Sequence, residues 1–386
     1  MRSLLPTGTV VSMEGAVSST PVRTGFRGGC YRADFCVERA SSESASSSAA
    51  GVAVLFIPCE IVESLFPGKI GTAAGDSCGA LVEDGSRLRV SVSECAGGGF
   101  FVSAVEPLPG GRGLLASMLR FRAVCRLSFR HLMHSWGEAG GFLLALLSGS
   151  RDCTDAAVSD AFRKAGLSHV IALSGMHVSL FGGLAAFLGR KLATRRFADA
   201  LSLSAVAFFV WFAGLSPSLF RALVCSLVMS LSSFLRLKRP EPLSALSICF
   251  LVHACVFPSH LSEAAFMLSY SSLCGIILFD RLFSRLLSCR LLPPLSASLS
   301  SSVSAIVSTA PVTLRLFGTF TPVGALSTAV VSPLVTLFIY TGLSGIAVCL
   351  AAPFLSVPFG AIISFIYGLV KKTALFFAGF PAFSIF

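Results

Sequence analysis

Long apolar runs separated by short polar connections dominate the second half of the chain. Crossing the ~30 Å hydrocarbon layer of a bilayer takes about 20 residues of helix. Runs near this length lie at 168–189, 198–214, 217–235, 243–258, 264–280 and 296–317. A further stretch, 322–350, predicts either one long tilted helix or two halves broken at Pro333. The pattern predicts a polytopic α-helical membrane protein of about seven to nine spans over 167–386.

The first 110 residues show a different pattern, in which short strand-like runs alternate with clusters of Gly, Ser and Pro. The runs lie at 8–17, 31–38, 51–57, 87–93 and 98–105. Short β-rich segments separated by turn residues favour a small β-barrel over helices. The serine-rich tract 41–48 has nothing to bury and is predicted to be a mobile loop tip. We therefore expect a β-domain over 1–110, followed by a linker over 111–166.

The linker contains one basic and apolar segment, 114–136, and one short apolar segment, 141–148. The first predicts an amphipathic helix on the membrane surface, or alternatively a helix that lines the path of a polyanion. Its polar side chains are those of Arg120, Arg122, Arg126, Arg130, His131 and His134. The second segment is too short to span a bilayer and is expected to be interfacial.

Composition supports the membrane assignment and excludes one large soluble enzyme. The 386 residues are 54% hydrophobic and 13% charged, whereas an ordinary soluble domain carries about 25% charged residues. The net charge of +11 is unevenly distributed. Residues 1–110 hold 8 Lys or Arg against 11 Asp or Glu, and residues 167–386 hold 14 against 4.

Ten of those fourteen cations fall in three short runs, 190–196, 236–239 and 281–290. Crossing the predicted spans in turn brings all three to one face, which the positive-inside rule assigns to the cytoplasm. Residues 1–166 are then extracytoplasmic, although the sequence has no obvious secretory signal at its start. Either a later span directs their translocation or an upstream apolar segment belongs to the protein, and we favour the second interpretation.

Polar residues interrupt the first apolar run at His169, Ser174, Gly175 and His177. On one continuous helix the two histidines share a face, and Ser174 and His177 are neighbours at i,i+3. Polar groups at membrane depth are costly, which makes this face a candidate functional site. The alternative is that they bond neighbouring helices and hold the bundle together. Arg221 similarly either faces a functional path, reaches the lipid headgroups, or pairs with Glu263.

Residues 166–178, GLSHVIALSGMHV, resemble the hallmark segment of the ComEC family of competence channels. Further matches follow in order: Gly214, Pro217 and Arg221 within GLSPSLFRAL, RPEPLSAL at 239–246, AFMLSY at 265–270, and 310–334 with its Phe-Gly and Pro residues. The resemblance covers about 150–386, and the expected β-domain fits the family's extracytoplasmic OB-like domain. The chain departs from the family pattern at Ala265, Met267 and Thr328, where Gly, Gln and Asn are usual.

The resemblance implies a multi-pass channel of the bacterial cytoplasmic membrane that imports single-stranded transforming DNA. Expected residues of the DNA path are His169, Ser174, Gly175, His177, Arg221 and Arg315. The implied partners are single-stranded DNA, an outer DNA receptor protein, a cytoplasmic helicase or motor ATPase and a separate nuclease, and a homo-oligomer stays open. Energy must come from such a motor, since the sequence has no P-loop.

No catalytic residues, cofactor or metal are expected. The metallo-β-lactamase-like domain that many family members carry at the C-terminus is absent from this sequence, as is a metal-binding HxHxDH motif. Two other functions stay open. One is an intramembrane serine hydrolase with Ser174 as nucleophile and His177 as base, although no acid is placed to orient the histidine. The other is a small-solute permease built from inverted repeats, although no internal symmetry is evident.

Overall fold

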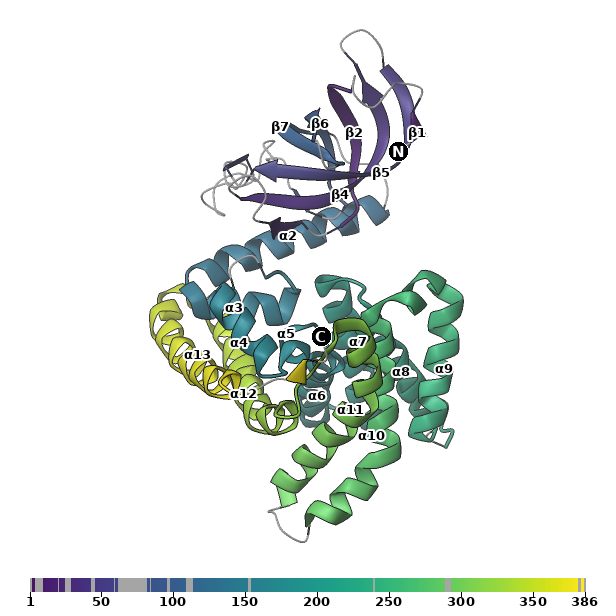
Figure 1. Ribbon diagram of the computed structural model, residues 1–386, viewed down its shortest axis with the longest axis vertical. Helices are drawn as coiled ribbons and strands as arrows, with labels where there is room; N and C mark the ends of the chain where they lie inside the picture. Colours follow the sequence, from purple (N-terminus) through teal and green to yellow (C-terminus); the bar gives the residue numbers. More distant parts are fainter. Residues whose placement is uncertain are drawn as a thin grey trace. The chain divides into compact units, whose positions relative to one another are not determined.

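The computed structural model forms two compact units, which we describe separately (Figure 1). The N-terminal unit comprises Met1–Leu132 and Ser150–Asp152, and the helical unit comprises Met133–Gly149 and Cys153–Phe386. The structure describes residues 2–3, 10–19, 21–24, 29–42, 46–58, 60–61, 82–83, 85–95, 98–108, 114–151, 154–238, 240–288, 293–380 and 383–384.

The N-terminal unit is built on a β-sheet whose pairings return to their starting strand. Its strands are β1 (Arg2–Ser3), β2 (Ser12–Val17), β3 (Val22–Thr24), β4 (Cys30–Ser41), β5 (Ser46–Pro58), β6 (Arg87–Glu94) and β7 (Phe100–Pro107). Strand β2 pairs with β4 and β6, β4 pairs with β5, and β6 pairs with β7, all antiparallel. A parallel pairing between β5 and β7 completes the ring. All five strands predicted from the sequence are confirmed.

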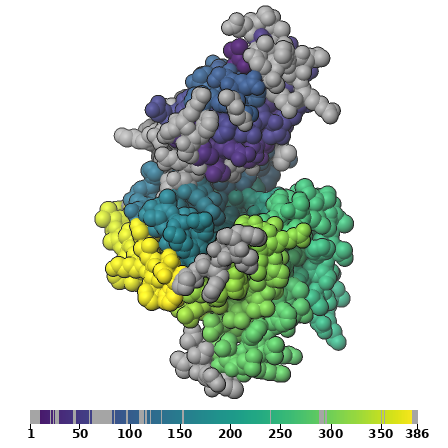
Figure 2. Space-filling view, viewed as in Figure 1, coloured from purple at the N-terminus to yellow at the C-terminus, as the bar shows by residue number. Residues whose placement is uncertain are grey.

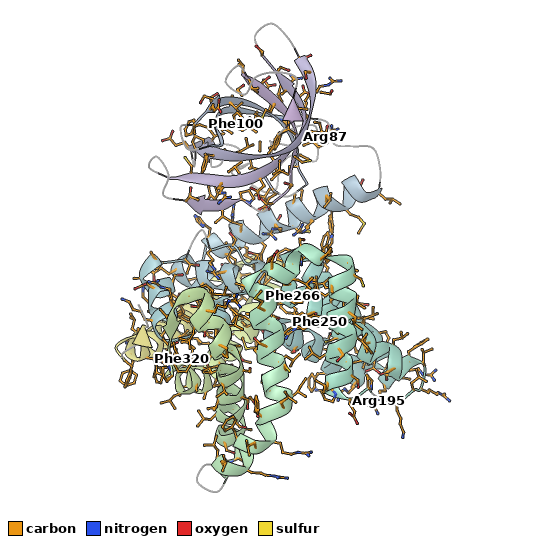
Figure 3. All side chains as sticks on the ribbon, turned by 45° about the vertical axis from the view of Figure 1, so that its right-hand side comes forward. Arg87, Phe100, Arg195, Phe250, Phe266 and Phe320 are labelled. Atoms are coloured by element: carbon orange, nitrogen blue, oxygen red, sulfur yellow. The ribbon has the colours of Figure 1, made fainter. Side chains whose placement is uncertain are left out.

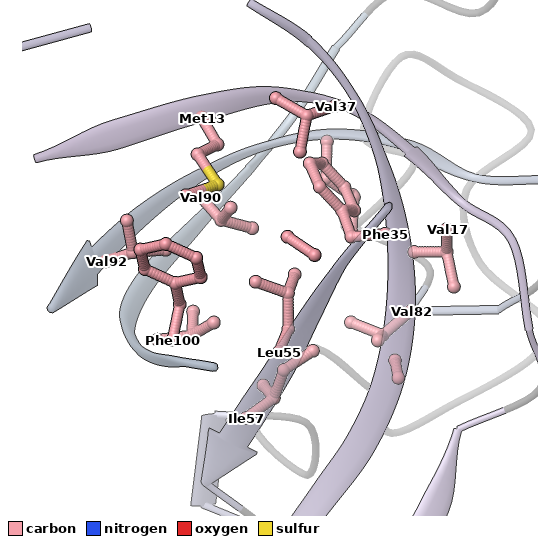
Figure 4. Packing of buried hydrophobic residues seen from close by; sticks show 14 of the residues in the cluster. Met13, Val17, Phe35, Val37, Leu55, Ile57, Val82, Val90, Val92 and Phe100 are labelled. Carbon is pink, nitrogen blue, oxygen red and sulfur yellow. The ribbon is translucent and has the colours of Figure 1, made fainter. Parts of the chain in front are cut away.

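Alternating side chains of these strands point into one apolar core. Met13, Phe35, Leu55, Ile57 and Val90 are fully buried there, each on a different strand except for the pair on β5 (Figure 4). Both ends of the serine-rich tract belong to strands, because Ser41 of β4 pairs with Ser46 of β5. Only residues 43–45 of that tract lie outside the described residues.

Helix α2 (Leu114–His134) buries Arg122 and Arg126 and exposes apolar side chains. Arg126 forms an ion pair with Glu83, with Nε and Oε2 3.4 Å apart, and both side chains are about 5% exposed. Arg130 donates to the Ser150 hydroxyl across 3.2 Å. Leu114, Met118 and Phe121 are instead exposed. These burials argue against a polyanion path along Arg122 and Arg126, while the side chains of Arg120 and His131 lie outside the described residues.

Among its described residues, the helical unit contains six helices that are long and apolar enough to cross a membrane: α7, α8, α10, α11, α12 and α13. Its elements are α3 (Gly137–Ser148), α4 (Ala156–Lys164), α5 (Ser168–Ile171), α6 (Gly175–Leu192), α7 (Arg195–Ala213), α8 (Pro217–Phe234), α9 (Pro242–Val256), a 3-10 turn η3 (Pro258–Ser262), α10 (Ala264–Ser288), α11 (Pro293–Phe317), β8 (Thr319–Phe320), α12 (Gly324–Ala351), a turn η4 (Pro353–Leu355), α13 (Ser356–Ala378) and β9 (Phe383–Ser384). The chain is therefore a multi-pass membrane protein.

Two segments differ from the sequence prediction, and a third is decided between two predicted alternatives. The predicted span 168–189 is two helices, because the chain is extended at Ala172 and Ser174 between α5 and α6. Helix α12 runs through Pro333 without interruption, which decides between one helix and two. Segment 141–148, expected to be interfacial, is buried within the helical unit as part of α3. Its Phe142 packs against Phe162, Phe338 and Tyr367.

Small residues allow close helix packing in this unit, as is usual where lipid surrounds a bundle. Gly275 of α10 lies against α11, where a Cβ at this position would come within 2.6 Å of the Ser304 carbonyl oxygen. The carboxylate of Asp280 on the same helix accepts from the hydroxyls of Ser300 and Ser301 on α11. In the space-filling view, α13 (yellow) flanks the segment of α3 and α4 (teal), which it contacts (Figure 2).

Consecutive helices joined by short connections reverse direction. From α6 to α11 this alternation brings the described parts of the three basic runs, 190–196, 236–238 and 281–288, to one end of the bundle. Arg239 and Arg290 lie outside the described residues. The opposite end collects the start of α6, the start of α8, the turn η3 and the end of α11.

Candidate functional site

The start of helix α6 is built by Ser174 and His177. Ser174 is the N-cap residue, with extended backbone, and His177 is the third residue of the helix. The backbone N–H of Ser174 donates to Nδ1 of His177 across 3.2 Å, and the Ser174 hydroxyl lies 3.2 Å from the same nitrogen. This is a capping box in which histidine takes the place usual for Glu or Gln. The predicted contact between Ser174 and His177 is therefore present, but at a helix start instead of mid-helix.

These hydrogen bonds assign the state of the His177 ring. Because Nδ1 accepts the backbone N–H, the ring is neutral and its hydrogen is on Nε2. The side chain is fully buried, and Nε2 has no hydrogen-bond partner among the described residues. A buried donor without an acceptor is costly, which marks this nitrogen as a candidate for binding a group from outside the chain.

Arg221, one turn after the start of α8, lies against the start of α6. A Cβ built on Gly175 would be 3.1 Å from Nη2 of Arg221, so the guanidinium lies directly beside this glycine. Nη1 of Arg221 donates to the carbonyl oxygen of Ser269 on α10. The guanidinium also lies 5.9 Å from the centre of the Tyr270 ring. The alternative pairing with Glu263 is not the one adopted, since that carboxylate lies 3.9 Å from His260.

His169 lies on the separate short helix α5, so it does not share a helix face with His177 as the sequence predicted. Its side chain is exposed, and Nε2 is 3.5 Å from the Thr328 hydroxyl at the start of α12. The two segments pack closely, because the hydroxyl of Ser327 donates to the carbonyl of Ala165 across 2.7 Å. Thr328, a position where the chain departs from the family pattern, is thus the residue beside His169.

Arg315 is exposed in the last turn of α11, at the same end of the bundle. Among the described residues, Arg315 forms no hydrogen bond or ion pair with Arg221, His169 or the start of α6. The structure therefore brings Ser174, Gly175, His177 and Arg221 together. His169 lies on the preceding short helix, α5.

Sequence reasoning missed a hydrogen-bonded chain of polar side chains next to this cluster. Tyr270 donates to the carbonyl oxygen of Cys249. Nδ1 of His253 lies 3.2 Å from the Tyr270 hydroxyl, and its Nε2 lies 3.1 Å from Nδ1 of His260. These hydrogen bonds join α9, η3 and α10, and the Phe250 and Phe266 side chains of α9 and α10 also pack against each other (Figure 3). Two histidines in 253–260, at the end of an apolar run, were the available sequence signal.

The described residues contain no group of three or more His, Cys, Asp or Glu side chains arranged to hold a metal ion. The cluster at α6 offers hydrogen-bond donors and positive charge. It combines a helix N-terminus, the hydrogen of His177 Nε2 and the guanidinium of Arg221, all of which suit an anion.

Residues 146–386 match the family model for competence proteins. The chain belongs to the competence protein family. This member is also similar to ComE operon protein 3 of Bacillus subtilis (strain 168), with 31% identity over 147 residues. That similarity covers 38% of this chain and 19% of the relative. No solved structure matches the chain. All six candidate residues lie within the part that the competence family model matches, and the ComEC-type resemblance of the sequence is confirmed.

Proposed function

We propose that this competence protein acts in DNA uptake, as a channel that imports single-stranded transforming DNA across the bacterial cytoplasmic membrane. Family membership supports a role in competence, and the contact between Arg221 and Gly175 carries the assignment of the DNA path. A guanidinium beside a helix N-terminus brings two positive potentials together. An anion relieves this repulsion, and a phosphate also accepts from several donors at once.

The location of this cluster fits the entry side of such a channel. It lies at the end of the bundle opposite the three basic runs. The positive-inside rule assigns those runs to the cytoplasm, so the cluster faces outward, and the N-terminal unit is extracytoplasmic. DNA phosphates then meet Arg221 near the outer surface. Arg315, exposed at the same end, is proposed as a peripheral contact.

The N-terminal unit is proposed to be an OB-like domain that guides the strand. Its ring of five strands, closed by one parallel pairing, supports this proposal. Tyr31, Phe35 and Phe100 are buried and do not serve as stacking platforms for bases. Phe56 and Phe101, both partly exposed, are register partners on β5 and β7 and take that role. Arg87 and Arg89 pair with Glu38 and Glu14, so stacking contributes more than charge.

The same geometry argues against a serine hydrolase. The Ser174 hydroxyl is within 3.2 Å of His177 Nδ1, as a nucleophile and base would be. That nitrogen already accepts the backbone N–H of Ser174, and no acid contacts the opposite nitrogen among the described residues. We therefore propose a transport protein without catalytic residues. A separate motor ATPase, an outer DNA receptor and a separate nuclease are its proposed partners, and a homo-oligomer is compatible with the fold.

The test replaces Arg221 in the chromosomal gene and measures nuclease-protected, internalised labelled DNA per cell. Arg221→Gln removes the charge and is expected to lower uptake at least about tenfold, as expected for losing roughly 1.5–3 kcal/mol of charged hydrogen bonding. Arg221→Lys retains the charge and should keep part of the uptake. Arg196→Gln, in a basic run at the opposite end, is the matched control and should leave uptake unchanged.

Membrane levels of each variant are measured in the same cells. Unchanged DNA uptake in an Arg221→Gln protein that is present at the normal level would remove Arg221 from the path. Import of small labelled solutes without import of DNA would instead support a permease.

A further inference from the structure

Two cysteines on neighbouring helices approach each other closely inside the helical unit. The sulfur atoms of Cys225 on α8 and Cys249 on α9 are 3.0 Å apart. From the sequence, cysteines in these apolar runs are expected to act as small hydrophobic side chains. Such packing does not require two thiols to face each other. We propose that Cys225 and Cys249 are a redox-active pair that forms a disulfide between α8 and α9.

The helix register supports this pairing independently of the sulfur distance. Helices α8 and α9 are antiparallel neighbours, and the start of α8 at Pro217 lies at the same end as the close of α9 at Val256. Cys225 is eight residues inside that end and Cys249 is seven, so both lie about 10–12 Å deep at 1.5 Å per residue. The two thiols therefore share one level of the bundle, and a bond of about 2.0 Å needs a further approach of only about 1 Å.

The two thiols pack against the same apolar cluster but differ in exposure, which gives each a separate part in thiol exchange. Cys249 is fully buried in an apolar cluster with Val224, Leu246 and Phe266. Cys225 is partly exposed. The accessible thiol is the one that attacks an external disulfide, and the buried thiol resolves the mixed disulfide that results.

The proposed oxidant is a disulfide of the general form RSSR, either small or carried by a protein. The Cys225 thiolate attacks one sulfur of RSSR, which forms a mixed disulfide and releases the first RSH. The Cys249 thiolate then attacks the Cys225 sulfur and releases the second RSH. In total, two protein thiols and RSSR give one protein disulfide and two RSH, so two electrons and two protons pass to the oxidant.

The disulfide would complete a set of links among the three helices around Arg221. Arg221 lies one turn before Cys225 on α8 and donates to the Ser269 carbonyl on α10. The next residue of α10, Tyr270, donates to the carbonyl of Cys249 on α9. Hydrogen bonds thus join α8 to α10 and α10 to α9, and the disulfide supplies the remaining link between α8 and α9. This link would fix the helix that carries Arg221.

The test uses the full-length protein in native membranes and does not involve DNA, so its result is separate from that of the channel proposal. Membranes are treated with oxidised glutathione or diamide, remaining thiols are blocked with N-ethylmaleimide, and protease digests are mapped by mass spectrometry. We expect a cross-linked peptide containing Cys225 and Cys249 in most of the protein, and its loss on treatment with dithiothreitol. The thermal unfolding midpoint should also be higher in the oxidised protein.

Three variants control the assignment. Cys225→Ser and Cys249→Ser should each abolish the cross-link and the rise in midpoint. Cys255→Ser, an exposed cysteine on the same helix α9, should leave both unchanged. The proposal is overturned if Cys225 and Cys249 of the wild-type protein are both recovered as maleimide adducts after oxidation, or if each is linked to another cysteine. The wild-type map decides this even where a variant does not fold.

Discussion

At the scale of single residues, His177 combines a structural task with an unused donor. Nδ1 accepts from the backbone of Ser174, whereas the hydrogen of Nε2 has no acceptor among the described residues. Glutamine at this helix position can also accept the N-cap N–H, and it is a usual residue of capping boxes. His177→Gln therefore separates the cap from the imidazole.

We expect His177→Gln to retain the thermal stability of the wild-type protein and to lower DNA uptake about fivefold, the effect of losing one hydrogen bond of roughly 1 kcal/mol. His177→Ala loses the cap as well and should lower both quantities, because an N-terminal cap contributes about 1 kcal/mol. Differential scanning calorimetry of the purified protein measures the thermal stability, and the uptake assay measures DNA import. Wild-type uptake in a stable His177→Gln protein would reduce His177 to a capping residue.

The sequence identified these residues but not their arrangement. The i,i+3 spacing of Ser174 and His177 correctly predicts their contact. The apolar run around them suggested one continuous helix, although Ser-Gly at 174–175 also suits a helix start. Once Ser174 caps α6, His169 falls on another element and cannot share a helix face with His177. The preference of Ser174 for an N-cap position therefore determined the local structure, and the length of the apolar run did not.

At the scale of elements, helix α10 packs closely against α11, and Gly275 makes this contact possible. A Cβ at Gly275 would lie 2.0 Å from the Ser308 hydroxyl and 2.6 Å from the Ser304 carbonyl oxygen. The backbone oxygen cannot move aside as a side chain can, so Gly275→Ala must push the helices apart. Overpacking of this kind costs about 1–3 kcal/mol.

We expect Gly275→Ala to lower the thermal unfolding midpoint of the detergent-solubilised protein. Gly183→Ala on α6 is the matched control, since a Cβ there meets nothing within 4 Å and the midpoint should not fall. Equal midpoints for the two variants would show that α10 and α11 are not packed through this glycine. The length of the apolar runs predicts both α10 and α11 from the sequence. Which faces of the two helices meet depends on tertiary contacts, which the periodicity of the sequence does not specify.

At the scale of the whole molecule, the distribution of charge along the sequence predicts which helix ends lie on the same face, and no single motif does so. The three basic runs were assigned to one face from their positions between apolar stretches, and the helix order brings their described parts to one end. By contrast, the contacts of Arg221 with Gly175 and of His253 with Tyr270 join segments 46 and 17 residues apart in sequence. Such contacts follow from how the helices pack, which the pattern of one chain does not specify.

The orientation itself leads to a prediction that needs neither DNA nor a partner. Ser259 is exposed in the turn η3, at the end of the bundle that bears Arg221. Leu237 is 62% exposed in a basic run at the other end. With the basic runs in the cytoplasm, a membrane-impermeant maleimide should label Ser259→Cys in intact protoplasts and Leu237→Cys only after permeabilisation. Mass spectrometry of the labelled peptide distinguishes each site from the native cysteines. The reverse pattern would place Arg221 on the cytoplasmic side, where it could not meet incoming DNA first, and both the extracytoplasmic N-terminal unit and the direction of transport would have to be abandoned.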